Sequence, residues 1–363
     1  MRNSEIDMRP QIGVLANYRD LLPVTGTTPL ISLGEGNTPL VRSRHLAHEI
    51  GCESLYFKLE GCNPTGSFKD RGMVVAVAKA LEAESTTLVC ASTGNTSASA
   101  AAYGAYCGIE TVVLVPKGSV ASGKLAQAIA YGARILVVNG NFDEALSMVK
   151  ELATRHSITL VNSLNPHRLH GQKTAAFEVI DSLGDAPDYL FIPVGNAGNI
   201  TAYWMGFSQY FSLGKASQKP KMMGFQAAGA APIVRGYAIE DPETIASAIR
   251  IGNPASWESA VAARDDSGGC IESVTDEEIM EAYQLMARHE GIFCEPASAA
   301  SVAGLIKTVK AGLDLSGKST VCVITGTGLK EPELASQYTS SLPEEIDPQL
   351  INLEEALNLS VVG

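Results

Sequence analysis

A recurring cycle of short apolar runs, glycine- and serine-rich turns and helical patterns constrains the fold of this chain most strongly. From about residue 55, each cycle places a β-branched or apolar run before a turn and a segment with helical periodicity after it. This order is typical of βαβ units, in which helices cover a parallel sheet. The chain is therefore predicted to adopt an α/β fold.

The predicted strands are nearly continuous in apolar residues, as strands covered on both faces should be. They are residues 87–91, 111–115, 134–138, 159–162, 189–193, 222–226 and 320–324. Helical periodicity is seen at 68–83, 121–131, 142–154, 276–289 and 297–309. A length of 363 residues exceeds the usual limit of one hydrophobic core, so two domains are expected. A single doubly wound sheet fits the pattern almost as well.

Charge and composition restrict the class of partner. The formal net charge of -12 argues against nucleic acid or an anionic membrane, both of which need a basic face. No stretch approaches the roughly 18 apolar residues of a spanning helix, and no targeting signal is seen at the start. The seven cysteines form no C-x-x-C pair and are interpreted as reduced thiols of a cytoplasmic protein. The six histidines form no ligand cluster, so no metal site is predicted.

In open α/β sheets, ligands bind beyond the carboxyl ends of the strands, so the turns there are the candidate sites. The Pro/Gly turn at 63–67 leads into a helix near Phe68, with Ser67 and Asp70 at capping-box spacing. Lys69 is thereby placed in the first helical turn, where the helix dipole favours a neutral amine suited to Schiff-base chemistry. A solvated surface lysine is the alternative interpretation.

Four further turns offer polar groups at strand ends. Residues 92–99 could bind a carboxylate or phosphate at a helix start, or could simply form a well-capped helix. The two glycines of 195–199 favour a phosphate cradle over an ordinary turn. Residues 325–328 place a hydroxyl at the sheet edge, or only end a strand. The loop 162–168 carries amide, hydroxyl and guanidinium groups suited to a phosphate ester, or is a solvated loop.

Together these segments resemble the threonine synthases, within the fold-type II, tryptophan synthase β-like, pyridoxal-phosphate enzymes. The resemblance runs from about residue 34 to residue 332. The stretches that carry it stand in the family's order: EGNTPL at 35–40, residues 63–72, 92–99 and 195–199, EPASA at 295–299, and TG at 325–326.

The resemblance implies that pyridoxal 5'-phosphate is bound to Lys69 as a Schiff base. Asn95 would contact the ring hydroxyl, and Thr325 would face the pyridine nitrogen and leave it largely unprotonated. The backbone that would hold the cofactor phosphate is that of Gly195, Asn196, Ala197, Gly198 and Asn199.

The resemblance also implies the substrate contacts. Thr96 would lie near the reacting carbons, as the second catalytic residue beside Lys69. The substrate carboxylate would be held by Ser92, Thr93, Asn95, Thr96 and Ser97. The substrate phosphate would be held by Lys124, Asn162, Ser163 and Arg168, which would supply the local cations that an acidic chain needs.

The family layout implies two open twisted-sheet α/β domains with the cofactor in the cleft between them. The large domain would comprise residues 1–60 and 155–345, around a smaller inserted domain of residues 61–154, with a tail at 346–363. A homodimer is also implied.

The implied reaction is elimination of phosphate from O-phospho-L-homoserine followed by addition of water to give L-threonine. Two alternatives remain open: a threonine or serine dehydratase of the same fold, and a non-catalytic metabolite sensor. Lys69 weighs against the sensor, and the loop 162–168 together with Lys124 weighs against the dehydratase.

Overall fold

The computed structural model describes residues 13–117, 122–139, 148–149, 151–152, 155–338 and 345–359, without the side chains of 122–124 and 336. The chain forms two compact units, Met1–Lys330 and Glu331–Gly363. The first unit contains two β-sheets with helices packed against them. The prediction of an α/β fold with two sheets is confirmed, and the alternative of one doubly wound sheet is wrong.

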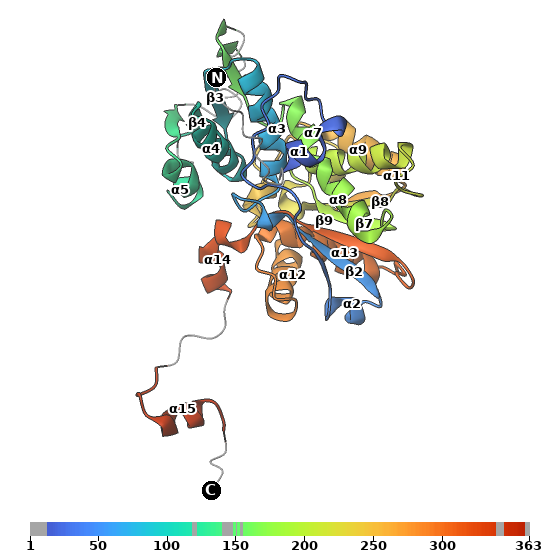
Figure 1. Ribbon diagram of the computed structural model, residues 1–363. Helices are drawn as coiled ribbons and strands as arrows, with labels where there is room; N and C mark the ends of the chain where they lie inside the picture. Colours follow the sequence, from blue (N-terminus) through green and yellow to red (C-terminus); the bar gives the residue numbers. More distant parts are fainter. Residues whose placement is uncertain are drawn as a thin grey trace, which may run out of the picture. The chain divides into compact units, whose positions relative to one another are not determined.

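The larger sheet has six strands, in the order β1-β2-β10-β7-β8-β9. All neighbouring pairs are parallel except β1 and β2. The strands are β1 (Leu40–Arg42), β2 (Ser54–Leu59), β7 (Tyr189–Pro193), β8 (Lys221–Ala227), β9 (Cys270–Val274) and β10 (Ser319–Ile324). Ser54 of β2 lies opposite Ser319 of β10, so segments from the blue and red ends of the colour scale meet in one sheet (Figure 1).

Helices cover both faces of this sheet. Successive side chains of each strand point to opposite faces, so they pack in two different hydrophobic cores. Phe191 and Cys322 pack with α12 (Asp276–His289) and α13 (Pro296–Lys310). Their neighbours Ile192 and Val323 pack on the other face, with α8 (Thr174–Leu183) and α9 (Gly198–Ser212). The near-continuous apolar runs of the sequence are the result of this two-sided burial.

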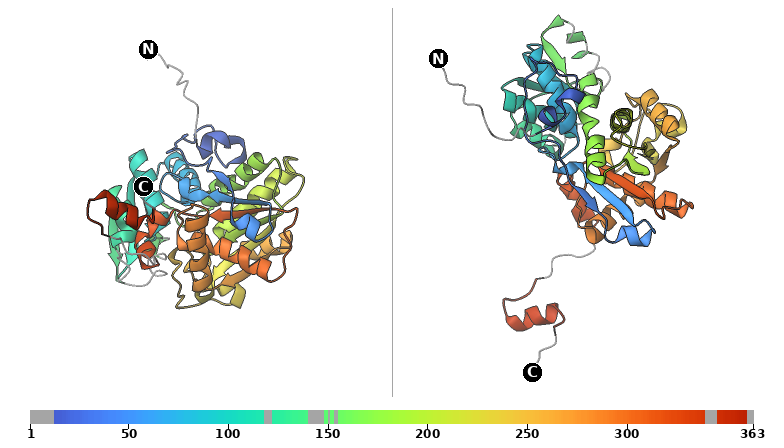
Figure 2. Two further views of the ribbon diagram at one scale, coloured as in Figure 1. Left: turned by 90° about the horizontal axis from the view of Figure 1, so that it is seen from below. Right: turned by 45° about the vertical axis from the view of Figure 1, so that its right-hand side comes forward.

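The smaller sheet has four parallel strands in the order β5-β4-β3-β6. The strands are β3 (Thr87–Ala91), β4 (Glu110–Pro116), β5 (Arg134–Val138) and β6 (Ile158–Leu160). Beside them lie α3 (Lys69–Glu82), α4 (Asn95–Cys107) and α5 (Ser122–Ala130). The right-hand view of Figure 2 shows these elements as a group distinct from the six-stranded sheet and its helices.

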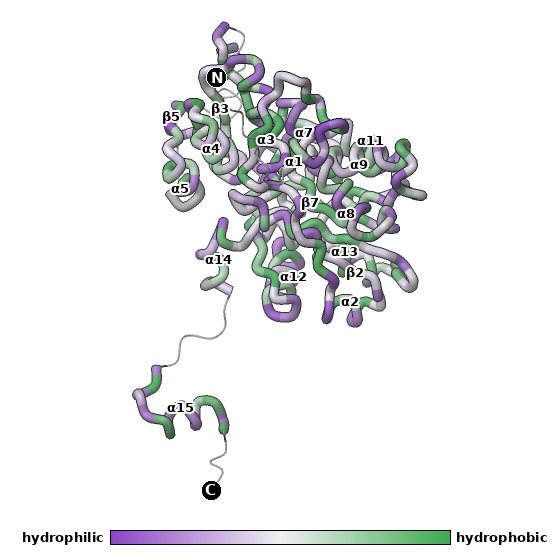
Figure 3. Tube along the Cα trace, in the orientation of Figure 1, coloured by the Kyte–Doolittle hydropathy of each residue, from purple (hydrophilic) through white to green (hydrophobic). Residues whose placement is uncertain are grey.

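Five further α-helices lie in the described part of the first unit. They are α1 (Val14–Asn17), α2 (Leu46–Glu49), α7 (Pro166–Gln172), α10 (Pro232–Arg235) and α11 (Trp257–Ser267). The middle turns of α3 are buried all round, and Figure 3 shows them in hydrophobic green. The predicted helix at 142–154 falls largely outside the described residues. Strand β6 pairs with β3, so the smaller sheet extends to Leu160, beyond the predicted boundary at 154; the domain boundaries stay a prediction.

The second unit contains α14 (Pro332–Gln337) and α15 (Leu350–Ala356). On α15 the apolar side chains of Leu350, Ile351 and Leu353 are exposed. None of the helices in the described part of the chain has both the length and the apolar character needed to cross a membrane.

Candidate active site

Lys69 is the first residue of α3, and the loop before it is fixed against the end of β10. The N–H of Phe68 donates to the carbonyl of Thr325 at 3.0 Å, and Ser67 forms an antiparallel bridge with Gly326. The Lys69 nitrogen lies 4.1 Å from the centre of the Phe68 ring. The prediction that Lys69 stands in the first turn of a helix is confirmed.

The predicted capping pair of Ser67 and Asp70 is wrong, because the residue before α3 is Phe68, and the Ser67 hydroxyl accepts from the N–H of Lys69 at 3.4 Å and not from that of Asp70 among the described hydrogen bonds. The Asp70 carboxylate instead accepts hydrogen bonds from the Thr65 N–H at 2.7 Å, the Thr65 hydroxyl at 2.6 Å and the Ser99 hydroxyl at 2.5 Å. Burial raises the pKa of this carboxyl. Asp70 thus ties the loop before Lys69 to α4, which is a tertiary role that a local spacing does not reveal.

Two glycines bring the helix of Lys69 against the helix of Arg168. A Cβ on Gly72 of α3 would lie 2.7 Å from the Arg168 carbonyl oxygen, and one on Gly171 of α7 would lie 1.9 Å from the Arg71 carbonyl oxygen. Real side chains cannot approach backbone atoms so closely, so both positions require glycine. The guanidinium of Arg168 is thereby held in the neighbourhood of Lys69.

The Lys69 amine is tuned towards its neutral form. Burial lowers the pKa of Lys69 to about 7, and Arg168 acts in the same direction, while the Glu295 carboxylate opposes both. The causes are therefore burial and a neighbouring cation, beyond the helix dipole that the sequence suggested. Lys69 still keeps part of its surface exposed, so a ligand can reach an amine of which a substantial fraction is neutral near neutral pH.

The turn between β7 and α9 has the geometry of an anion cradle. Ala197 has a left-handed φ of 63°, and α9 begins at Gly198. A Cβ on Gly195 would lie 2.9 Å from the Cα of Ile249, so the backbone there packs closely. The Asn199 side chain is buried, yet neither its oxygen nor its nitrogen has a hydrogen-bond partner among the described residues. A buried, unused amide beside a helix start fits a bound phosphate group.

Asn196 joins this cradle to the second predicted anion-binding loop. Its side-chain nitrogen donates to the Ser163 hydroxyl at 2.9 Å, and its oxygen accepts from the N–H of Ala255 at 2.6 Å. Ser163 therefore receives a hydrogen bond from the cradle and keeps its own proton for a ligand. The cofactor and substrate phosphate residues implied by the family resemblance are thus neighbours in this structure.

The polar side chains of the loop 162–168 differ in how fully they are hydrogen-bonded within the protein. Asn162 exchanges two hydrogen bonds with Ala91, accepting at 2.8 Å and donating at 2.7 Å, so its amide mainly fixes the end of β3. Arg168 is only 1% exposed and donates to the Val161 carbonyl at 3.3 Å. Its Nε has no partner within the part of the chain that the structure describes. Lys124 lies in the first turn of α5, and its side chain is outside the described residues.

The turn after β3 leads into α4, whose first residue is Asn95. The N-cap is Gly94, which has no side chain to cap the helix, so the N–H groups of this helix start stay a predicted ligand site. The Ser97 hydroxyl donates to the Gly94 carbonyl at 2.7 Å, and the Gly94 N–H donates to the Ser92 hydroxyl at 3.3 Å. Thr96 and Ser97 are buried, whereas Ser92 and Thr93 are partly exposed. The helix start can thus offer N–H groups to a carboxylate.

Asn95 and Thr325 both donate to the carboxylate of Glu295. The distances are 2.9 Å from the Asn95 amide and 3.0 Å from the Thr325 hydroxyl. The Ser298 hydroxyl lies 2.8 Å from that of Thr325. The sequence marked Glu295 only as part of a family stretch and gave it no role. The local sequence indicates only that Glu295 precedes a helix, because Pro296 is typical of a first helical residue.

Arg71 is the centre of a buried cluster of charges, the ionic hub, formed by Arg71, Glu60, Glu178 and Lys58. Arg71 donates to Glu60 at 2.6 Å and to Glu178 at 2.6 Å, and Lys58 donates to Glu178 at 2.7 Å. Two cations face two carboxylates, and no side chain of the four is more than 8% exposed. The sequence pattern missed this hub, which fixes the first turn of α3 directly after Lys69.

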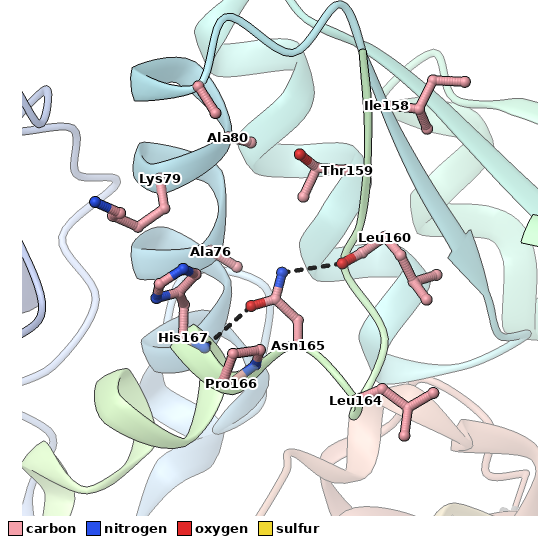
Figure 4. Close-up of a pocket in the computed structure, with 11 residues that line it drawn as sticks. Ala76, Lys79, Ala80, Ile158, Thr159, Leu160, Leu164, Asn165, Pro166 and His167 are labelled. Atoms are coloured by element: carbon pink, nitrogen blue, oxygen red, sulfur yellow. Dashed lines mark hydrogen bonds between the residues drawn. The ribbon is translucent and has the colours of Figure 1, made fainter. Parts of the chain in front are cut away.

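A cavity of about 380 Å³ lies elsewhere, between the later turns of α3 and the loop after β6 (Figure 4). Ala76, Lys79 and His167 line it, and Asn165 bridges the Leu160 carbonyl and the His167 N–H beside it. Its lining includes none of Lys69, Asn95, Asn199 or Thr325. This cavity therefore borders the loop 162–168 but is lined by none of the individual residues predicted to bind cofactor or substrate.

Comparison with known proteins agrees with this geometry. The family model described as "Pyridoxal-phosphate dependent enzyme" matches residues 31–326. A threonine synthase from Halalkalibacterium halodurans is 59% identical over 323 residues, covering 89% of this chain and 91% of the relative. A threonine synthase from Synechocystis is 56% identical, covering 91% and 86%. The structure of maize serine racemase superposes with a TM-score of 0.71 at 20% identity, covering 83% of this chain and 91% of that one, which indicates a shared fold.

Proposed function

We propose that this chain, which belongs to the pyridoxal-phosphate dependent enzymes and within them to the threonine synthases, converts O-phospho-L-homoserine and water into L-threonine and phosphate. Phosphate would leave from the γ-carbon, and water would add at the β-carbon. The cofactor is pyridoxal phosphate, and the proposal extends to the residues that hold it and the substrate.

Pyridoxal phosphate, when bound, withdraws electrons and stabilises negative charge on substrate carbons next to the amine. Lys69 would hold it through a covalent bond, and residues 195–199 would bind its phosphate. Asn95 and Thr325 would contact its ring. The left-handed turn at Ala197 and the unpartnered buried amide of Asn199 among the described residues support this assignment.

The Lys69 amine is the proposed base. Once the substrate amine has displaced it, it would take the proton from the substrate α-carbon and then assist in removing a β-proton. A pKa of about 7 leaves a large neutral fraction at physiological pH, which general-base catalysis requires. Thr96, buried at the start of α4, would lie beside the reacting carbons, and the N–H groups of that helix start would bind the substrate carboxylate.

The observation that carries the choice of a phosphorylated substrate is the state of Arg168. Burial lowers the pKa of this guanidinium to about 10, and its one described hydrogen bond goes to a backbone carbonyl at 3.3 Å. A buried cation of this kind needs an anionic partner, and a phosphate ester provides one. Ser163, with its hydroxyl proton unused by Asn196, would bind the same group. A dehydratase acting on threonine or serine has no such phosphate to bind.

Replacing Arg168 by Ala tests this assignment. The KM for O-phospho-L-homoserine should rise at least about tenfold, because a charge-assisted hydrogen bond is lost. Arg264→Ala, which removes a partly exposed arginine that pairs with Asp265 on α11, is the matched control and should leave KM unchanged. An unchanged KM in Arg168→Ala would remove Arg168 from the substrate site.

An absorbance spectrum before and after borohydride separates the three functions. A reducible chromophore that disappears in Lys69→Ala, with phosphate and threonine formed together, supports the synthase. Release of ammonia from threonine or serine without phosphate turnover supports the dehydratase. A protein that never forms the chromophore with added pyridoxal phosphate supports the sensor.

We also propose that the chain acts in the cytoplasm, as its cysteine pattern suggests, and that it forms a homodimer, as the family resemblance implies. Light scattering of the purified protein tests the dimer directly. A mass of one chain across the micromolar range would contradict it.

A further inference from the structure

The carboxylate of Glu295 joins side chains from the two sheets. Asn95, its donor at 2.9 Å, begins α4 directly after β3 of the four-stranded sheet. Thr325, its donor at 3.0 Å, directly follows β10, which lies inside the six-stranded sheet. One buried carboxylate therefore fixes how these two side chains stand relative to each other.

The backbone around Glu295 leaves the carboxylate little freedom. Its own N–H donates to the Gly326 carbonyl at 3.1 Å, and the preceding residue, Cys294, forms a bridge with Thr327. A Cβ on Gly326 would lie 2.6 Å from the carboxylate, so only glycine permits this close approach. Glu295 is 2% exposed. Packing therefore restrains the carboxylate in addition to its hydrogen bonds.

Hydrogen-bond accounting shows why a carboxylate is needed here. The Asn95 nitrogen and the Thr325 hydroxyl both donate, so the residue between them must accept twice and donate nothing. The Thr325 proton is used on Glu295, so Ser298, 2.8 Å away, is the donor to the Thr325 oxygen. Ser298 in turn accepts from the Gly326 N–H at 2.9 Å. A glutamine at 295 has one acceptor oxygen for these two donors. Its side-chain nitrogen would face either the Asn95 amide, which is another donor, or the Thr325 hydroxyl, which would then have to turn its proton towards Ser298.

The geometry points to Glu295 as the positioning residue of the ring-binding site: its carboxylate sets the orientation of Asn95 and Thr325 before the cofactor arrives. This inference rests on the proposed function, which gives Asn95 and Thr325 their contacts with the cofactor ring. Because both side chains are already held, less conformational entropy is lost when pyridoxal phosphate binds. The affinity for the cofactor should therefore depend on Glu295.

The charge of Glu295 has a second effect at the same site. The Glu295 carboxylate raises the pKa of Lys69, whereas the buried Arg168 lowers it, so Glu295 favours the protonated form of the lysine nitrogen. Removing the charge while keeping the shape should therefore make protonation at that nitrogen harder. The pH at which the lysine-bound cofactor changes its absorbance should move to lower values.

The experiment compares wild type with Glu295→Gln, Glu295→Asp and the control Glu290→Gln. Glu290 is a carboxylate outside the site that accepts from the Ser43 hydroxyl and the Leu46 N–H, both at 2.7 Å. Each apoprotein is titrated with pyridoxal phosphate, and the absorbance of the lysine-bound form is then followed against pH. Glu295→Gln should bind at least about tenfold more weakly and shift the transition to lower pH.

Glu295→Asp should lose affinity, since its shorter side chain cannot reach both partners, but should keep the transition near the wild-type pH. Glu290→Gln should lower Tm and leave both site readouts unchanged. A folded Glu295→Gln with wild-type affinity and transition would overturn the inference. If that variant does not fold, Glu295→Asp decides, and wild-type affinity there would overturn it. A wild type without any borohydride-reducible lysine bond would instead defeat the proposed function.

Discussion

Arg71 of α3 and Arg168 of α7 lie at the contact between these two helices and are both buried, but their charges are paired in opposite ways. Arg71 in the ionic hub meets two carboxylates and two threonine hydroxyls. Arg168, equally buried, has one described bond to a carbonyl and an Nε without a partner in the described ranges. A charge that is fully paired inside the protein supports the fold, whereas a charge left short of partners supports binding. Both arginines are buried, so it is the number of their charged partners that separates the structural role of Arg71 from the binding role proposed for Arg168.

The largest expected change in the free energy of unfolding comes from removing the charge of Arg71 from the ionic hub. Arg71→Met leaves Glu60 and Glu178 buried with too few cations, which should lower the free energy of unfolding by about 3–5 kcal/mol. Urea denaturation followed by circular dichroism measures this. Arg264→Met is the matched control and should change stability by less than about 0.5 kcal/mol. An equally small change for Arg71→Met would break the contrast between the two arginines.

The hub should also make stability depend on pH in the acid range. Burial alone would raise the pKa of Glu178, but Arg71 and Lys58 outweigh it and lower the pKa to about 2. The hub's stabilisation is therefore complete above the ordinary glutamate pKa of 4.5 and is lost as the pH falls towards 2. The loss should reach up to about 3 kcal/mol. Between pH 5 and about 2.5, the free energy of unfolding should fall less steeply with decreasing pH for Glu178→Gln than for wild type. Equal slopes in the two proteins would exclude Glu178 as the source of the pH dependence.

Among these buried charged residues, the smallest effect on stability is expected at Arg168. Arg168→Met removes a buried, poorly paired charge, so the free energy of unfolding should change by less than about 1 kcal/mol in either direction. Inorganic phosphate at ten times its Kd should stabilise wild type by about 1.4 kcal/mol and leave the variant unaffected. Thermal denaturation with and without phosphate provides both values. A loss comparable to that of Arg71→Met would show that Arg168 is a structural residue.

Strands that face apolar cores on both sides could be predicted from sequence, and β3 and β7 have the predicted bounds. Strand β2 was not predicted because Lys58 interrupts its apolar run, although Lys58 is buried in the ionic hub. Strand β9 lies at the sheet edge and exposes Glu272. A strand that carries a paired charge or an exposed edge residue lacks the pattern that periodicity detects.

The candidate site was predictable where its residues cluster in a turn at a strand end. The turns after β3, β7 and β10 were found because small and polar residues follow apolar runs directly. The role of Glu295 was not predictable, because its partner Asn95 lies 200 residues away and its partner Thr325 lies 30 residues away. Asp70 was misassigned for the same reason, since its carboxylate oxygens accept from Thr65 and Ser99 and form no capping box with Ser67.

The pairing of β10 with β2 also orders events during synthesis of the chain. The four-stranded sheet uses residues 87–160, a continuous stretch that can pair soon after it leaves the ribosome. The six-stranded sheet must wait for β10, which fits between β2 and β7 and ends at Ile324. Until then β2 and β7 each have an unpaired edge. We expect nascent chains that stop before residue 319 to contain a formed small sheet and an open, aggregation-prone large one.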